Sequence, residues 1–128
     1  MAITVKNQTL ADSKKIAVIH ATGIFTATTG EEADVVKVDV SALEDAPSSV
    51  KILRIWYSNS VPGTFLEFDG ATDAMAIMIE EGSNFIDYRS VGGLQNNATT
   101  PTGDITLTTL GTAAAGNGYS ITIEVSKS

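Results

Sequence analysis

Short runs in which apolar and polar residues alternate recur along almost the whole chain. Between residues 36 and 40 the alternation is strict, with three valines on one face and Lys37 and Asp39 on the other. A period of two is that of a β-strand with one buried face, whereas an amphipathic helix repeats about every 3.6 residues. Turn residues such as Pro62-Gly63 separate the runs, and no long helical pattern interrupts them. The pattern therefore predicts an all-β chain.

The spacing of these runs and the length of the chain define the expected architecture. Eight or nine short strands, with turns at sandwich-like intervals, predict an antiparallel β-sandwich or jelly roll. The 128 residues, 43% of them hydrophobic, suffice for one core. Because there is no cysteine, packing, sheet hydrogen bonds or assembly must stabilise the fold. We expect a single β-sandwich domain over residues 15–128, preceded by an N-terminal arm or edge strand over residues 1–14.

The strongest strand signal lies in residues 50–57. Apolar residues occupy both of its faces, so we expect a strand in the interior of a sheet. Strict alternation puts Trp56 on the same face as Val50 and Ile52, while Tyr57 points to the opposite face. One of the two aromatic rings is expected in the core, and the other is a candidate anchor for a binding partner.

The charge of the chain argues against nucleic acid as a partner. The net charge is −7, the pI is near 4.4, and the eight lysines and arginines are scattered, whereas phosphate binding needs clustered basic residues. The longest mostly apolar stretch, residues 74–79, is too short to span a bilayer, and no secretory signal is visible. We expect a soluble protein with no membrane or nucleic-acid partner.

Residue types that support catalysis are sparse. His20 is the single histidine and lies in a strand-like run, so a packed or surface role is expected. Residues 69–73 (DGATD) faintly resemble a calcium-binding loop, but they lack the acidic ladder and terminal glutamate of an EF-hand, and a turn capped by aspartates explains them better. We therefore expect no catalytic residue, no metal ligand and no cofactor, and predict that the protein is not an enzyme.

Several phrases of the sequence resemble small all-β structural proteins of tailed bacteriophages. They are VDVSAL at residues 38–43, VKILRIWYS at 50–58, LEFDGATD at 66–73, GGLQNN at 92–97 and the whole ending from residue 103. The likeness extends roughly from residue 15 to the C-terminus and includes no reactive signature. Some proteins of this class decorate or cement the capsid. The resemblance implies a non-enzymatic virion protein, made in the bacterial host cytoplasm, that binds the capsid exterior and reinforces the shell.

This resemblance implies the major capsid protein as the partner, with a homo-oligomer or many copies on a symmetric shell. The candidate contact residues are Ile3, Val5 and Lys6 near the N-terminus, Trp56 and Tyr57 in the strongest strand, and Leu94, Gln95, Asn96 and Asn97 in a loop. Two alternatives stay open. A tail or neck adaptor would assemble with itself into rings or tubes, and a carbohydrate-binding module would need a planar row of exposed aromatic rings.

Overall fold

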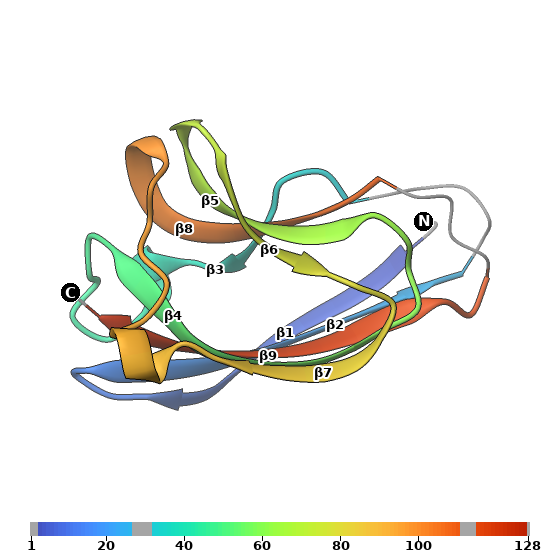
Figure 1. Cartoon of the computed structure of the whole chain (residues 1–128), viewed down its shortest axis with the longest axis horizontal. Coiled ribbons are helices and arrows are strands. Elements are labelled where there is room, and N and C mark those ends of the chain that lie inside the picture. Colours follow the sequence, from blue (N-terminus) through green and yellow to red (C-terminus); the bar gives the residue numbers. More distant parts are fainter. Residues whose placement is uncertain (1–2, 27–31, 111–114, 128) are drawn as a thin grey trace.

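The computed structural model describes residues 3–26, 32–110 and 115–127 (Figure 1). Within these residues it has nine β-strands and two short 3₁₀ turns. The strands are β1 (Ile3–Asp12), β2 (Ile16–Phe25), β3 (Val35–Val38), β4 (Val50–Asn59), β5 (Thr64–Thr72), β6 (Ala74–Ile79), β7 (Gly82–Asp87), β8 (Thr99–Thr109) and β9 (Gly118–Lys127), and the turns are η1 (Val40–Ala42) and η2 (Arg89–Val91). Every strand pair is antiparallel, so the predicted all-β antiparallel fold is confirmed.

The strands form two sheets that lie one above the other in Figure 1. The five-stranded sheet has the order β1-β2-β9-β4-β7, and the four-stranded sheet has the order β3-β8-β5-β6. From β2 onward every connection crosses between the sheets except the one between β5 and β6. Without β1, the two four-stranded sheets have the strand order of a jelly roll. The prediction of a sandwich or jelly roll is therefore confirmed, with β1 added at one edge.

The core lies between the inner faces of the two sheets. Ile19, Ile55 and Ile121 come from the five-stranded sheet, and Leu66 and Leu107 come from the four-stranded sheet, each at most 4% exposed. Burying one such side chain contributes about 1.5–3 kcal/mol. These residues alternate with outward-facing side chains along their strands, which is the pattern that the sequence predicts.

A β-bulge in β4 changes which residues share a face. The register against β9 slips between Ile52 and Arg54, so that Val50 and Ile52 face the core while Trp56 faces solvent. The prediction that Val50, Ile52 and Trp56 lie on one face is wrong, because the bulge inserts one residue, Leu53, into the alternation. β4 does lie in the interior of its sheet, between β9 and β7.

A second bulge turns Lys37 inward, although the sequence predicts that it points away from the valines of its strand. The register of β3 against β8 slips between Val36 and Val38, and Lys37 is only 3% exposed. Its Nζ donates to Oε2 of the buried Glu32 at 2.8 Å and lies 5.5 Å from the centre of the Tyr119 ring. A buried ammonium is tolerated here because a carboxylate neutralises it.

β1 is an edge strand whose described side chains, residues 4–12, are all exposed. It pairs with β2 along its length, and one bulge interrupts the pairing near Leu10. Asn7 Nδ2 donates to the carbonyl of Val36 in the other sheet at 3.3 Å. At the end of β1, the carboxylate of Asp12 accepts a hydrogen bond from Lys127 Nζ. Backbone pairing and a few polar contacts, rather than apolar burial, thus hold β1 in place.

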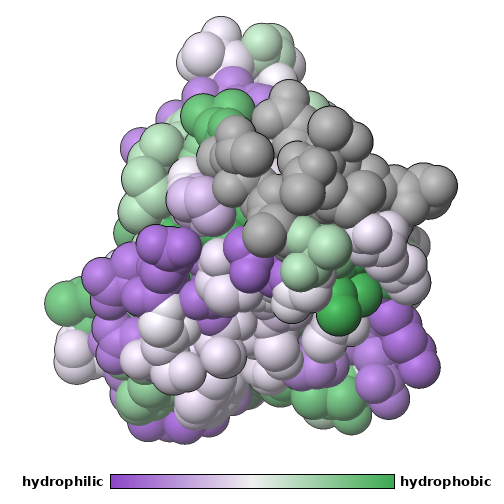
Figure 2. Space-filling view, turned by 90° about the vertical axis from the view of Figure 1, so that its right-hand side faces the viewer, coloured by the Kyte–Doolittle hydropathy of each residue, from purple (hydrophilic) through white to green (hydrophobic). Residues whose placement is uncertain are grey.

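The end of the sandwich that faces the viewer in Figure 2 is mostly hydrophilic or neutral over its described residues, with small separate hydrophobic spots. Exposed aromatic side chains lie instead on the outer face of the five-stranded sheet, where Trp56 and Phe85 are 37% and 47% exposed. In the part of the chain that the structure describes, no helix has the length and hydrophobicity needed to cross a membrane.

Candidate contact face

Three rows of side chains cross the outer face of the five-stranded sheet. In each row, every residue lies directly opposite its neighbour on the next strand. From β1 to β7, the first row is Lys6, Thr22, Ser120, Ser58 and Ser83; the second is Gln8, His20, Thr122, Trp56 and Phe85; the third is Ala11, Val18, Glu124, Arg54 and Asp87. We call these residues the contact face. Its two basic residues balance its two acidic residues, so the face is neutral although the whole chain carries a charge of −7.

An aromatic pair occupies the β4–β7 half of the contact face. The rings of Trp56 and Phe85 stack with their centroids 5.3 Å apart and an interplanar angle of 22°. The Arg54 guanidinium lies 5.0 Å from the centre of the Trp56 ring, a cation–π contact. The bulge in β4 makes this arrangement possible, because without it Trp56 would share a face with the buried Ile52.

A bidentate ion pair fixes Arg54 beside the aromatic rings. Its Nε donates to Oε1 of Glu124 at 2.8 Å, and its Nη2 donates to Oε2 at 2.7 Å. These hydrogen bonds lower the pKa of Glu124 and raise that of Arg54. Asp87, at the end of the same row, has a lowered pKa because Arg89 donates to its carboxylate. All charges in this row are therefore paired and held in place near neutral pH.

A shallow hollow of about 440 Å³ lies next to Trp56. Its lining consists of Trp56, Tyr57, Ser58, Ser83, Asn84, Ser120 and Thr122. Hydroxyl groups and one amide thus surround an aromatic ring, and Ser83 Oγ donates to Ser58 Oγ at 3.2 Å. This combination can bind a partner that offers both apolar surface and hydrogen-bonding groups.

His20 lies on the contact face, in the row that also contains Trp56. Its Nδ1 lies 2.8 Å from Oγ1 of Thr122, within hydrogen-bonding distance. Among the described residues, no carboxylate is hydrogen-bonded to the other ring nitrogen, which is the group that orients a histidine acting as a general base. The geometry therefore supports binding by this face more directly than it supports proton transfer.

The structure separates the candidate contact residues of the N-terminal segment. Lys6 lies on the contact face, opposite Thr22. Val5 points to the other side of β1 and is 39% exposed. Ile3 pairs with Phe25 at the start of β1, but its side chain lies outside the described residues.

The two adjacent aromatic residues of β4 point in opposite directions. Trp56 is on the contact face, whereas Tyr57 is a core residue that is 6% exposed. The Tyr57 hydroxyl donates to Oε1 of Glu80 at 3.3 Å, and burial raises the pKa of Tyr57. Trp56 is therefore the ring that a partner can reach across the surface of the sheet.

The loop residues 94–97 begin beside β4, on the same side of that strand as β7, which pairs with β4 only from Arg54 onward. Leu94 is half-buried against the core and forms an isolated bridge with Ile52, with backbone hydrogen bonds of 2.8 and 3.1 Å. Asn96 Oδ1 accepts the backbone N–H of Ala98 at 3.0 Å, whereas Gln95 and Asn97 are exposed. Gln95 and Asn97 are thus accessible to a partner, and Leu94 fixes the loop.

Sequence reasoning missed Phe85 and Arg54 as members of this face. The signal for Phe85 was weak: it lies in a short run, and only the pairing of β7 with β4 puts it beside Trp56. Arg54 lies in the strongest strand, two residues from Trp56 and therefore on the same face, but its ion-pair partner Glu124 comes from β9. The pairings with β7 and β9 cannot be read from local spacing.

Comparisons with known proteins assign no family. No family model matches the chain, and no curated protein matches it. One similar solved structure is a cupin superfamily protein from Desulfitobacterium hafniense, with 13% sequence identity and a TM-score of 0.31. The alignment covers 97% of this chain and 77% of that protein. At this identity and TM-score, the likeness does not transfer a function.

Proposed function

We propose that this protein is a non-enzymatic structural protein of a tailed bacteriophage, which binds the major capsid protein on the outside of the shell and reinforces it. The contact face is the surface that meets the shell. Many copies, or a homo-oligomer at symmetry positions, would bridge neighbouring capsid subunits, so that rupture of the shell must also break these contacts.

The observation on which this proposal rests is the exposed stack of Trp56 and Phe85 on a neutral face of an otherwise acidic protein. Tryptophan, tyrosine and arginine are enriched at the energetic centres of protein interfaces. Here the ion pair with Glu124 already fixes Arg54, so little side-chain entropy is lost when a partner covers the Trp56 ring. Two further considerations agree with the proposal: the sequence resemblance, and the use of jelly rolls in viral capsid domains, which is an analogy of fold alone.

Co-sedimentation with empty capsids of the source phage tests the proposal. The protein should bind saturably, with a fixed number of copies per shell. Trp56→Ala should weaken binding by about 30-fold or more, the effect of truncating an interface residue worth about 2 kcal/mol. Trp56 is also the single tryptophan, so capsid binding should shift its fluorescence to shorter wavelength as the ring leaves water.

Met78→Ala is the matched control, because Met78 is an apolar residue, 55% exposed, on the outer face of the other sheet. It should bind capsids like the unaltered protein, and urea unfolding should show that both variants are folded. Equal binding by Trp56→Ala would contradict the assignment of this face. Absence of capsid binding, together with rings or tubes formed by the protein alone, would instead indicate a tail or neck protein.

Carbohydrate binding is the second candidate, and the hollow beside Trp56 favours it. An indole ring flanked by three serines, a threonine and an asparagine can stack on a sugar ring and bond its hydroxyls. A panel of oligosaccharides, screened by Trp56 fluorescence and by calorimetry, tests this function without any capsid. Saturable binding of a sugar that is lost in Trp56→Ala would favour this candidate over capsid attachment.

A further inference from the structure

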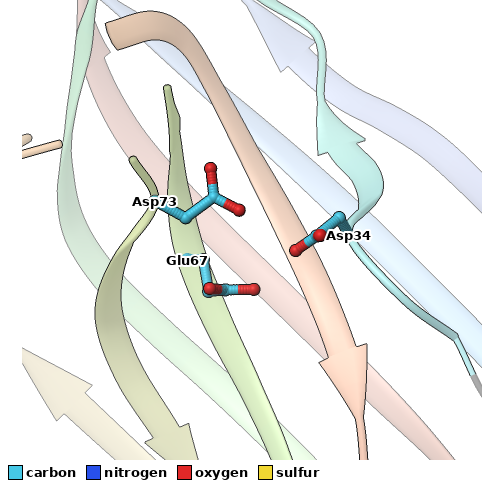
Figure 3. A group of neighbouring side chains, drawn as sticks. All are labelled: Asp34, Glu67 and Asp73. Carbon is cyan, nitrogen blue, oxygen red and sulfur yellow. The ribbon is translucent and has the colours of Figure 1, made fainter. Parts of the chain in front are cut away.

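Three carboxylates gather on the outer face of the four-stranded sheet, on the side of the molecule opposite the contact face. Asp34 precedes β3, Glu67 lies in β5, and Asp73 lies between β5 and β6. One oxygen of each lies within 4.8 Å of an oxygen of the other two. Figure 3 shows Asp34 on one side of β8 and Glu67 and Asp73 on the other, with the carboxylates turned toward one another.

Among the described residues, this acidic group has few hydrogen-bond donors and no basic side chain within ion-pair distance. The Thr108 hydroxyl lies 3.0 Å from Oε1 of Glu67 and 3.4 Å from Oδ1 of Asp34, but it has one proton and can serve only one of them. Gly70 N–H donates to Oδ1 of Asp73 at 3.0 Å. Among the described residues, no lysine or arginine forms an ion pair with any of the three carboxylates. No ion pair within the described residues therefore offsets the repulsion among the three carboxylates when they are ionised.

The pKa of Glu67 reflects this environment. Burial raises it, and a contact with Asp34 and the charges of Asp34 and Asp73 raise it further, while the hydrogen bond from Thr108 acts in the opposite direction.

An independent observation comes from Thr106, a second threonine of β8. It is 1% exposed, and its Oγ1 has no hydrogen-bond partner. Thr106 lies directly opposite Glu67 and two residues before Thr108, so its side chain projects from the same face of the sheet, beside that of Glu67. A buried hydroxyl without a partner is unfavourable, and such groups in folded proteins usually have a ligand, an ion or a water.

We propose that this group is a Ca²⁺ site, with Asp34, Glu67 and Asp73 as carboxylate ligands and the Thr106 hydroxyl as a neutral oxygen ligand. Ca²⁺ binds oxygen at about 2.3–2.6 Å, so two oxygens on one ion lie at most about 4.6–5.2 Å apart, and oxygens that all lie within 4.8 Å of one another can share it. Mg²⁺ loses its bound water reluctantly and demands near-ideal octahedral geometry, so it should bind this group more weakly. The ion would link Asp34, just before β3, to Asp73, in the turn between β5 and β6, with β8 lying between them.

Calorimetry and thermal unfolding of the full chain, freed of metal by a chelator, test the site with CaCl₂ alone. One Ca²⁺ should bind per chain, with a dissociation constant on the order of 10⁻⁴–10⁻³ M, the range of extracellular calcium modules. At a Ca²⁺ concentration ten times the dissociation constant, the melting temperature should rise by about 4–7 °C, and the same concentration of MgCl₂ should give a smaller rise.

Three variants separate a built site from a general effect of charge. Glu67→Gln should abolish the Ca²⁺-dependent shift. Thr106→Val should keep or raise the melting temperature without Ca²⁺, because it removes the unpaired hydroxyl, but it should weaken Ca²⁺ binding several-fold. Glu81→Gln, which alters an exposed carboxylate between β6 and β7, should bind Ca²⁺ like the unaltered chain.

Two results would overturn the site: no saturable binding up to about 10⁻² M CaCl₂, ten times the weakest expected constant, or equal losses in Glu67→Gln and Glu81→Gln. Unchanged Ca²⁺ binding in Thr106→Val would remove Thr106 from the ligand set.

Discussion

Arg54 does two things on the contact face: it neutralises Glu124 and it lies against the Trp56 ring. The pair is partly shielded from water, with the Glu124 side chain 9% exposed and the Arg54 side chain 25% exposed. Its hydrogen bonds lower the pKa of Glu124 in the folded state. Because the unfolded chain then binds the proton more readily than the folded one, the stability of the fold depends on pH through this residue.

The pair should therefore stabilise the fold fully above the ordinary glutamate pKa of about 4.3, and progressively less as the pH falls through the lowered pKa of the folded state. Glu124→Gln removes the titrating group and tests this directly. Its free energy of unfolding in urea should lie below that of the unaltered protein at pH 7, and the two should converge as the pH falls below about 4. A difference that stays constant between these pH values would show that the ion pair does not stabilise the fold.

At the scale of single strands, the sequence predicts well which residues form strands, but it predicts less well which side chains of a strand face the core. Alternation identified the β character of residues 36–40 and 50–57, which contain parts of β3 and most of β4. In each strand a β-bulge shifts the alternation of inward and outward side chains by one residue, so that Lys37 points inward and Trp56 points outward. A bulge adds one residue to one strand of a pair, and nothing in the local pattern marks its position.

Contacts between distant strands explain the rest of what could not be predicted. Asp73 lies in the segment that faintly resembled a calcium loop, but its neighbours Asp34 and Glu67 come from other parts of the chain. Phe85 and Trp56 likewise meet only because β7 pairs with β4. Spacing along the sequence describes a site within one element, whereas both candidate sites here are assembled by sheet order.

β1 is the element that the jelly roll needs least. Deleting residues 1–10 keeps Asp12, which binds Lys127 and accepts the backbone N–H of Glu44 at 2.8 Å. Because the described side chains of β1 are exposed, unfolding should remain cooperative, at a somewhat lower urea concentration. Capsid binding should weaken, since the deletion removes Lys6 and Gln8 from the contact face.

Circular dichroism during urea titration, alongside capsid co-sedimentation, measures both effects. Loss of a cooperative transition would mean that β1 is part of the folding unit. If the deletion variant is folded and binds capsids as the full chain does, the contact must lie on the other four strands of the sheet.

At the scale of the whole molecule, the last two strands each occupy an interior position, β8 in the four-stranded sheet and β9 in the five-stranded sheet. β9 lies between β2 and β4, and β8 lies between β3 and β5. The pairing of β2 with β9 joins Ile16 to Ser126, nearly the full length of the chain apart. Such distant pairings must overcome loop-closure entropy before they stabilise anything, so folding is expected on the millisecond-to-second scale of all-β domains.

Removal of β9 should therefore have an effect very different from the removal of β1, although each strand has ten residues. β9 contributes four core residues, Tyr119, Ile121, Ile123 and Val125, all at most 4% exposed. At about 1.5–3 kcal/mol each, their loss removes about 6–12 kcal/mol, comparable to the whole stability of a typical domain, about 5–15 kcal/mol. A chain that ends at residue 117 should show no cooperative unfolding by Trp56 fluorescence or circular dichroism, whereas the chain without residues 1–10 should. Cooperative unfolding of the chain without β9 would show that the other strands form a stable core before the last strand closes the five-stranded sheet.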